Sequence, residues 1–226
     1  GRFPESVEFT DRNSDAERRD ITINALYWNP ISSEVFDPFE GEKDLQEGLV
    51  RFIGDAEDRI QHDALRLLRV IRFRALIDGQ YHPDTFKALH NKAKQVSVLS
   101  GTRRYRELEK ILLGPTPQRA FEDLWETDVI ETLLPELHAC KGVAQPSKAH
   151  NEGDVWNHTL QVISSFTDDH KADTRWAALL HDIGKPVTFS IDEERIKFNE
   201  HAKQGGKIAK DVLDRLQFPA ARRDRS

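Results

Sequence analysis

The sequence of 226 residues contains no methionine and only one cysteine, Cys140. One cysteine excludes an internal disulfide, which suits a reducing compartment, so we expect a cytoplasmic protein. No apolar run approaches the roughly 20 residues that a membrane span needs, so no membrane partner is expected. No basic segment followed by an apolar one opens the chain, which argues against a secretory signal. A chain that lacks methionine and opens on Gly1 is expected to be a fragment.

The charge balance excludes a uniformly basic nucleic-acid-binding protein, because the net charge is −6. Charged residues make up 32% of the chain and hydrophobic residues 38%, which indicates a polar, soluble, helical protein. Basic residues nevertheless gather between Arg51 and Lys110. A local basic stripe matters more than the total charge when the partner is a folded RNA.

The apolar periodicity predicts a mainly α fold with a small β part. Residues 1–54 are rich in turns, with a strand expected at 6–10, a charged helix beginning over 16–26 and a hairpin with strands at 26–28 and 34–36. Residues 78–83 are predicted to form a turn. Helical spacing begins near residue 56, and a polar stretch at 141–148 is typical of a linker. Helices are expected near 84–94, 101–113, 116–133, 155–166, 174–181 and 202–216, with a hairpin or loop at 189–198.

Two segments rich in arginine carry the clearest chemical signal. The first runs from Arg18 to Leu26 as R-R-D-I-T-I-N-A-L, and the second from Gln61 to Phe73 as Q-H-D-A-L-R-L-L-R-V-I-R-F. Arginine forks bind phosphates, and a paired Asp and Arg can present donors and acceptors to the edge of a base. In the second segment an aspartate and three arginines recur every third residue, so on a helix they share a face that wraps obliquely. That arrangement suits a curved ligand extending from base to phosphates.

Both segments, in this order, resemble nucleotide-binding motifs of the class II tRNA nucleotidyltransferases, a family that includes CCA-adding enzymes and bacterial poly(A) polymerases. The resemblance implies that Arg19 contacts the incoming nucleotide and that Asp20 orients this arginine. Asn24 would support the same site. The pattern that follows, with Asp37, Gly41 and Asp44 in D-x-x-x-G-x-x-D-L, resembles a flexible connection between two domains of the family.

In the second segment the resemblance implies that Asp63 and Arg66 read the base edges of CTP and ATP. Arg69 and Arg72 would hold the ribose, the phosphates or the shape of the site. His62 stands where the family usually has a glutamate, so base selectivity can differ from the family pattern.

A third segment, from Gly101 to Leu108, resembles the last motif of the same family. There Arg103 and Glu107 are spaced as an i, i+4 pair that would brace the nucleotide-binding helix.

The metal-binding residues of nucleotidyl transfer are missing from this sequence. Phosphoryl transfer needs metal ions held by carboxylates, which the family supplies from a Gly-Gly-x-x-x-Arg loop and a D-x-D pair. Neither pattern occurs here. We therefore name no catalytic residue, expect the Mg²⁺ ligands to lie outside this chain, and expect the chain alone to bind nucleotide poorly.

A set of histidines follows the predicted linker at 141–148 and resembles the HD superfamily of metal-dependent phosphohydrolases. The resemblance implies that His158, His181 and Asp182 are ligands of a divalent metal of unknown identity. Lys185 would contact a phosphate, and His201 would be a further ligand or a phosphate contact. The distal aspartate of that family is not evident in this sequence.

Together these motifs predict three parts: 1–54 as the C-terminal end of a nucleotidyltransferase α/β domain, 55–140 as a helical nucleotide-recognition and tRNA-binding region, and 141–226 as an incomplete helical HD domain. The expected function is template-independent addition of CCA to the tRNA 3′ end. The expected partners are tRNA, ATP and CTP, and not DNA. Three alternatives stay open: a poly(A) polymerase, an HD phosphohydrolase with a nucleotide- or RNA-binding remnant, and a helical RNA-binding protein without chemistry.

Overall fold

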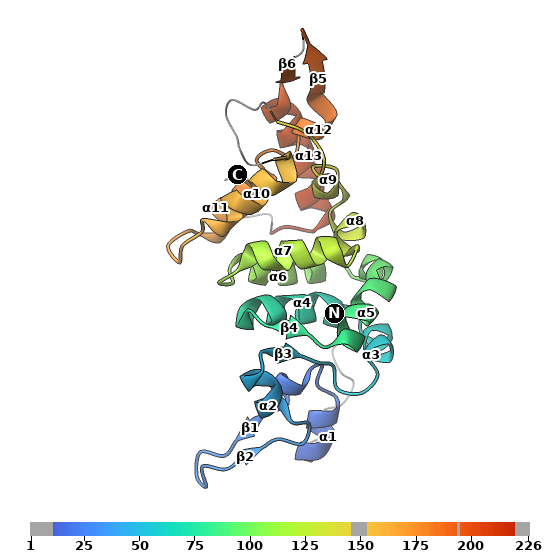
Figure 1. Cartoon of the computed structure of the whole chain (residues 1–226), viewed down its shortest axis with the longest axis vertical. Coiled ribbons are helices and arrows are strands. Elements are labelled where there is room, and N and C mark those ends of the chain that lie inside the picture. The colour runs from blue at the N-terminus through green and yellow to red at the C-terminus, as the bar shows by residue number, and fades with distance from the viewer. Residues whose placement is uncertain (1–10, 146–152, 194, 220–226) are drawn as a thin grey trace.

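The computed structural model describes residues 11–145, 153–193 and 195–219. Figure 1 shows helices stacked along one axis of an elongated molecule, with a short hairpin near each end. The strands in the described part form three separate two-stranded pairs, so the predicted mainly α fold with a small β part is confirmed. No described helix is both long and apolar enough to cross a membrane.

The elements follow one another along the chain as α1 (Arg12–Glu17), η1 (Thr22–Asn24), β1 (Tyr27–Trp28), β2 (Val35–Phe36), α2 (Gly41–Gln46), β3 (Leu49–Val50), α3 (Ala56–His62), α4 (Leu65–Ile77), β4 (Gln80–Tyr81), α5 (Pro83–Asn91), η2 (Ala93–Val98), α6 (Gly101–Leu112), α7 (Pro117–Glu126), α8 (Val129–Leu133), α9 (Pro135–His138), α10 (Val155–Ser164), α11 (Ala172–Leu180), α12 (Lys185–Thr188), β5 (Phe189–Asp192), β6 (Arg195–Phe198) and α13 (His201–Arg215). Both predicted hairpins are confirmed, since β1 pairs with β2 and β5 with β6, each antiparallel.

The first helix lies earlier in the chain than the sequence predicts. The charged helix expected to begin at residue 16 instead spans Arg12–Glu17. The β-branched residues from Ile21 to Ile23 lose side-chain freedom in a helix, and Ile21 instead forms a bridge with Phe52. The strand expected at 6–10 lies outside the described residues.

Two features of the middle section also differ from expectation. The predicted turn at 78–83 contains β4, which pairs in parallel with β3. This pairing needs a glycine at Gly79, where an added Cβ would lie 2.2 Å from the backbone oxygen of Gly48. The predicted helix over 116–133 is two helices, α7 and α8, because the chain turns at Asp128 with φ of 59°. The predicted connection around Gly41 includes a short helix, α2.

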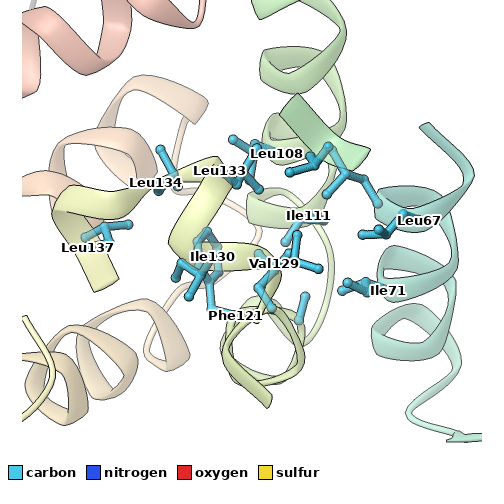
Figure 2. Close-up of a cluster of buried hydrophobic side chains, with 14 of the residues drawn as sticks. Leu67, Ile71, Leu108, Ile111, Phe121, Val129, Ile130, Leu133, Leu134 and Leu137 are labelled. Atoms are coloured by element: carbon cyan, nitrogen blue, oxygen red, sulfur yellow. The ribbon is translucent and has the colours of Figure 1, made fainter. Parts of the chain in front are cut away.

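One hydrophobic cluster runs through the stacked helices and fixes α4 in place. Figure 2 shows Leu67 and Ile71 of α4 facing Ile111 of α6, with Phe121 of α7 and Val129 of α8 beside them. Each apolar side chain of this size contributes about 1.5–3 kcal/mol when fully buried. Because the apolar face of α4 is committed to this core, its arginines are left on the remaining surface of the helix.

Aromatic packing joins the C-terminal helices to α6. Phe218 lies with its ring centroid 4.9 Å from that of Tyr105 on α6 and 5.7 Å from that of Trp176 on α11. The beginning of α6 also packs closely on the end of α13, since a Cβ at Gly101 would lie 2.3 Å from the Arg215 oxygen. The same cluster of buried residues therefore extends from Ile21 to Phe218.

Candidate functional site

Asp20 lies buried in the segment that joins α1 to η1, with 4% of its surface exposed. Its carboxylate accepts hydrogen bonds from Arg69 Nε at 2.5 Å and from Asn24 Nδ2 at 3.0 Å. Burial raises the pKa of Asp20, but the hydrogen bonds from Arg69 and Asn24 outweigh it and leave the pKa below its usual value. Asp20 therefore binds Arg69 of α4, and not the neighbouring Arg19 that the sequence suggested.

Arg19 itself is exposed and faces a different carboxylate. Its Nη2 lies 2.8 Å from Asp15 Oδ2, and its guanidinium lies 5.8 Å from the ring centroid of Tyr27. Asp15 also accepts hydrogen bonds from Tyr27 and Arg18, and these contacts together with Arg19 hold the pKa of Asp15 well below its usual range. The Arg19 side chain is 47% exposed, so it can exchange these contacts for an anionic ligand.

The four polar residues of the second motif have separate partners. Asp63 accepts from Arg103 at 2.8 and 3.0 Å, and Arg66 donates to the backbone oxygens of Arg59 and Arg18 at 3.0 and 3.1 Å. Arg69 binds Asp20, as described above. Arg72, on the next turn of α4, pairs with Glu107 of α6.

That last pair joins Arg72 Nε to Glu107 Oε2 at 3.0 Å. Glu107 is 3% exposed and also accepts from Lys110 at 2.7 Å. The predicted i, i+4 pair between Arg103 and Glu107 is therefore wrong. Arg103 instead binds Asp63, just before α4, and Glu107 binds Arg72 on α4. Both residues of α6 therefore hold the α4 region, but through partners that their spacing did not predict.

Two cavities lie side by side at the beginning of α4. Arg66 lines one of about 470 Å³ together with Glu17, Arg59 and other residues, and Asp63 lines another of about 410 Å³ together with Arg103. His62 contributes to both. The expected base-reading residues thus lie at cavity walls.

A second group of polar residues forms where α10 meets the end of α11. Ligand atoms of His158, His181 and Asp182 all lie within 4.8 Å of one another. Asp182 Oδ2 lies 3.0 Å from His181 Nε2, 3.7 Å from His158 Nε2 and 2.7 Å from Lys185 Nζ. Burial raises the pKa of Asp182, but the contacts with His181 and Lys185 hold it well below its usual range.

The donor set fits a divalent metal. Two imidazoles and a carboxylate are common ligands for such ions. Asp182 Oδ2 is buried and faces both imidazoles, so it lies where a metal held by the two histidines would need a carboxylate ligand. His181 Nδ1 lies 2.7 Å from the Ala178 oxygen, which orients the ring with Nε2 toward Asp182.

The other two predicted residues of this centre are placed differently. Lys185 contacts Asp182 and also donates to Gln145 Oε1 at 2.7 Å. His201 begins α13, and its Nδ1 lies 2.9 Å from the Phe198 oxygen. The three-residue group does not include His201 in the part of the chain that the structure describes.

The sequence analysis did not single out two polar residues of these sites. Gln145 lies in the stretch interpreted as a linker, where no pattern marked it, yet it binds Lys185. Arg59 lies seven residues before Arg66, but the two residues are on different helices, α3 and α4, so no helical spacing marked it.

Three family models match successive parts of the chain. They are described as the poly A polymerase head domain over residues 1–51, a probable RNA- and SrmB-binding site of polymerase A over 80–141, and the HD domain over 155–224. In this order the three parts are similar to the poly(A) polymerase and CCA-adding nucleotidyltransferase family. The resemblance found in the sequence motifs is thereby confirmed.

Curated relatives match nearly the whole chain. The chain is 37% identical over 216 residues to a multifunctional CCA protein of Halorhodospira halophila, covering 93% of this chain and 51% of that protein. It is 34% identical to the multifunctional CCA protein of Nitrosomonas eutropha, with coverage of 93% and 50%. The chain therefore spans about half the length of these curated relatives.

Among solved structures, the chain resembles the Bacillus stearothermophilus CCA-adding enzyme in complex with CTP, with a TM-score of 0.61 and 26% identity over 96% of this chain and 48% of that one. It also resembles the Thermotoga maritima CCA-adding enzyme complexed with tRNA, with a TM-score of 0.60 and 25% identity over 92% and 45% of the two chains.

Proposed function

We propose that this chain is the nucleotide-selecting and RNA-binding part of a template-independent tRNA nucleotidyltransferase. Such an enzyme adds C and A from CTP and ATP to the 3′ end of tRNA, here in the cytoplasm. The observation that carries the proposal is the position of Asp63 and Arg66 at the beginning of α4, each at the wall of a cavity. The relatives named as CCA proteins support it.

The proposed division of the chain follows the sequence motifs. Residues 1–54 form the end of the nucleotidyltransferase domain, 55–140 the recognition and tRNA-binding region, and 141–226 part of an HD domain. The family matches at 1–51, 80–141 and 155–224 support these three parts without fixing their boundaries.

In this proposal Asp63 and Arg66 read the edge of the incoming base, because a carboxylate accepts and a guanidinium donates hydrogen bonds. A protein that reads bases with its own side chains needs no nucleic-acid template. Arg19, exposed near the same region, contacts the triphosphate. Arg69 and Arg72 hold the shape of the site through the carboxylates that they bind.

Both enzyme families matched here are typically dependent on divalent metals. For nucleotidyl transfer we propose Mg²⁺, which would neutralise charge that develops on the triphosphate oxygens. The sequence has neither the Gly-Gly-x-x-x-Arg loop nor the D-x-D pair, so its own residues supply binding and orientation and not the transfer-metal ligands.

The proposal is tested with the whole gene product, a tRNA transcript that lacks CCA, and CTP and ATP supplied separately or together. We expect the wild-type protein to restore CCA. We expect Asp63→Asn to lower kcat/KM for the nucleotides about 10- to 100-fold, because one acceptor at the base edge is lost. Asp84→Asn, an exposed carboxylate change on α5, is the matched control and should leave kcat/KM unchanged.

Two results would contradict CCA addition, and a third would contradict the role of Asp63. Extension with ATP alone into a long tail would identify a poly(A) polymerase. RNA binding without any extension would favour an RNA-binding protein without chemistry. An unchanged nucleotide preference in Asp63→Asn would remove Asp63 from base reading.

A second activity is proposed on a separate observation, the grouping of His158, His181 and Asp182. These residues would hold a divalent metal for a phosphohydrolase, with Lys185 near enough to Asp182 to contact a bound phosphate. The metal would supply Lewis-acid activation of a phosphate ester. His201 would contribute only if the beginning of α13 moves toward the group.

Alanine at His181 and at Asp182 separates the two activities. We expect each variant to lose divalent metal, measured by elemental analysis after dialysis, and any metal-dependent phosphatase activity, while CCA addition continues. Loss of CCA addition in both variants with full metal retention would contradict this assignment.

A further inference from the structure

Arg59 of α3 binds the main chain of the segment that carries Arg19. Its Nη2 donates to the backbone oxygens of Glu17 and of Arg19, the latter at 2.6 Å. Arg66 donates to the intervening oxygen of Arg18 at 3.1 Å. Three consecutive carbonyl groups are therefore bound by two arginines from two different helices.

Arg66 also binds the element that carries Arg59. Arg66 Nη1 donates to the backbone oxygen of Arg59 at 3.0 Å, which links the beginning of α4 to the end of α3. Burial, and then the nearby charge of Arg66, lower the pKa of Arg59. Two guanidinium groups repel each other at short range. The backbone carbonyl oxygens that both groups bind offset this repulsion.

The position of Arg59 relates it to the proposed nucleotide site. Arg59 and Arg66 line the same cavity of about 470 Å³, beside His62. Arg59 is half-buried, and its Nη2 reaches the carbonyl oxygens of Glu17 and Arg19. The side chain of Arg19, in contrast, extends from the bound segment and is exposed.

We propose that Arg59 is a positioning residue of the nucleotide site, which rests on the function proposed above. It fixes the main chain of residues 17–19, so that Arg19 and Arg66 keep one geometry relative to the bound nucleotide. A planar guanidinium can bind two carbonyl oxygens at once, whereas an ammonium group is a single compact charge on a flexible stem. Lysine at this position would therefore hold the segment less firmly.

The test uses the whole gene product with Arg59→Lys and Arg59→Gln. KM and kcat for CTP and for ATP are measured separately on tRNA substrates that accept each nucleotide. We expect Arg59→Lys to raise both KM values about tenfold, which corresponds to the loss of one charge-assisted hydrogen bond, with little change in kcat. Arg59→Gln should raise them further.

Arg104→Lys is the matched control. Arg104 of α6 also donates to two backbone oxygens, those of Leu99 at 2.9 Å and Ser97 at 3.1 Å. Burial lowers its pKa as it lowers that of Arg59. We expect Arg104→Lys to lower the melting temperature without changing either KM, since its carbonyl partners lie in a different segment.

The outcomes distinguish this inference from the proposed function. A wild-type protein that adds no nucleotide overturns the proposed function and the inference with it. An active wild-type protein combined with unchanged KM values in Arg59→Lys overturns the inference alone. The same conclusion follows if Arg59→Lys and Arg104→Lys raise KM equally. Should Arg59→Gln fail to fold, Arg59→Lys still decides between these results.

Discussion

Replacing Asp20 with alanine should destabilise the protein strongly, because a buried carboxylate with three donors is removed. The change leaves Arg69, Asn24 and the Ile21 amide without the acceptor that they share. Removing one member of a buried ion pair costs about 3–5 kcal/mol. Because the side chain of Arg69 is 33% exposed, water compensates part of the loss, and we expect about 3 kcal/mol.

The effect should depend on pH in a defined direction. The pKa of Asp20 is lower in the folded protein than the roughly 3.9 of an unfolded aspartate. Its contribution to stability is therefore complete above about pH 4 and is lost as the pH falls through the lower folded value. Urea unfolding followed by circular dichroism at pH 7 and at successively lower pH should show a stability difference between wild type and Asp20→Ala that narrows below about pH 4.

The matched control is Arg103→Ala, which removes another ion pair at the same site. Arg103 and Asp63 are 2.8 Å apart, and their side chains are 46% and 39% exposed. Exposed pairs contribute at most about 1 kcal/mol. The reasoning is refuted if Asp20→Ala costs no more than Arg103→Ala at pH 7, or if its cost stays constant down to pH 3.

Three further predictions concern other parts of the fold. Burial raises the pKa of Asp123 to about 6, so between about pH 4 and 6 the folded state binds a proton that the unfolded state releases. Wild-type stability should therefore fall by about 3 kcal/mol as the pH rises through that window. In urea titrations Asp123→Asn should lack this dependence on pH. Burial also raises the pKa of Cys140 to about 12, so iodoacetamide should label this thiol, by mass spectrometry, only after denaturation. Gly41→Ala should lower stability by about 1–3 kcal/mol in urea unfolding, since the new Cβ would lie 2.4 Å from the Thr22 oxygen, and an unchanged midpoint would contradict this close packing.

Local patterns in the sequence predicted the elements whose signals are themselves local. The hairpin of β1 and β2 follows from two short apolar runs around Asn29 and Pro30, and α6 follows from its apolar periodicity. The break between α7 and α8 was missed, since an apolar pattern can continue across Asp128 although the chain there takes a left-handed conformation. The pairing of β3 with β4 was missed because it joins residues about thirty positions apart.

In the candidate sites, too, the sequence did not predict contacts between residues that are far apart in the chain. Periodicity identified the arginines of α4, but it does not specify which partner each arginine meets. Asp63 pairs with Arg103 over 40 positions and Arg69 with Asp20 over 49, and such pairings depend on how the helices stack. The spacing of Arg103 and Glu107 suggested a local pair, whereas the fold gives each of them a distant partner.

These pairings give the arginines of α4 different tasks. Buried Asp20 and Glu107 hold Arg69 and Arg72, so the middle of α4 is fixed by charges that solvent reaches poorly. The beginning of the helix carries its polar groups at cavity walls and binds partners that are exposed or belong to the main chain. Exchanging an exposed contact for a ligand costs little, whereas exchanging a buried pair costs several kcal/mol. A ligand at this helix is therefore expected to displace contacts at its first turn and to leave the two buried pairs intact.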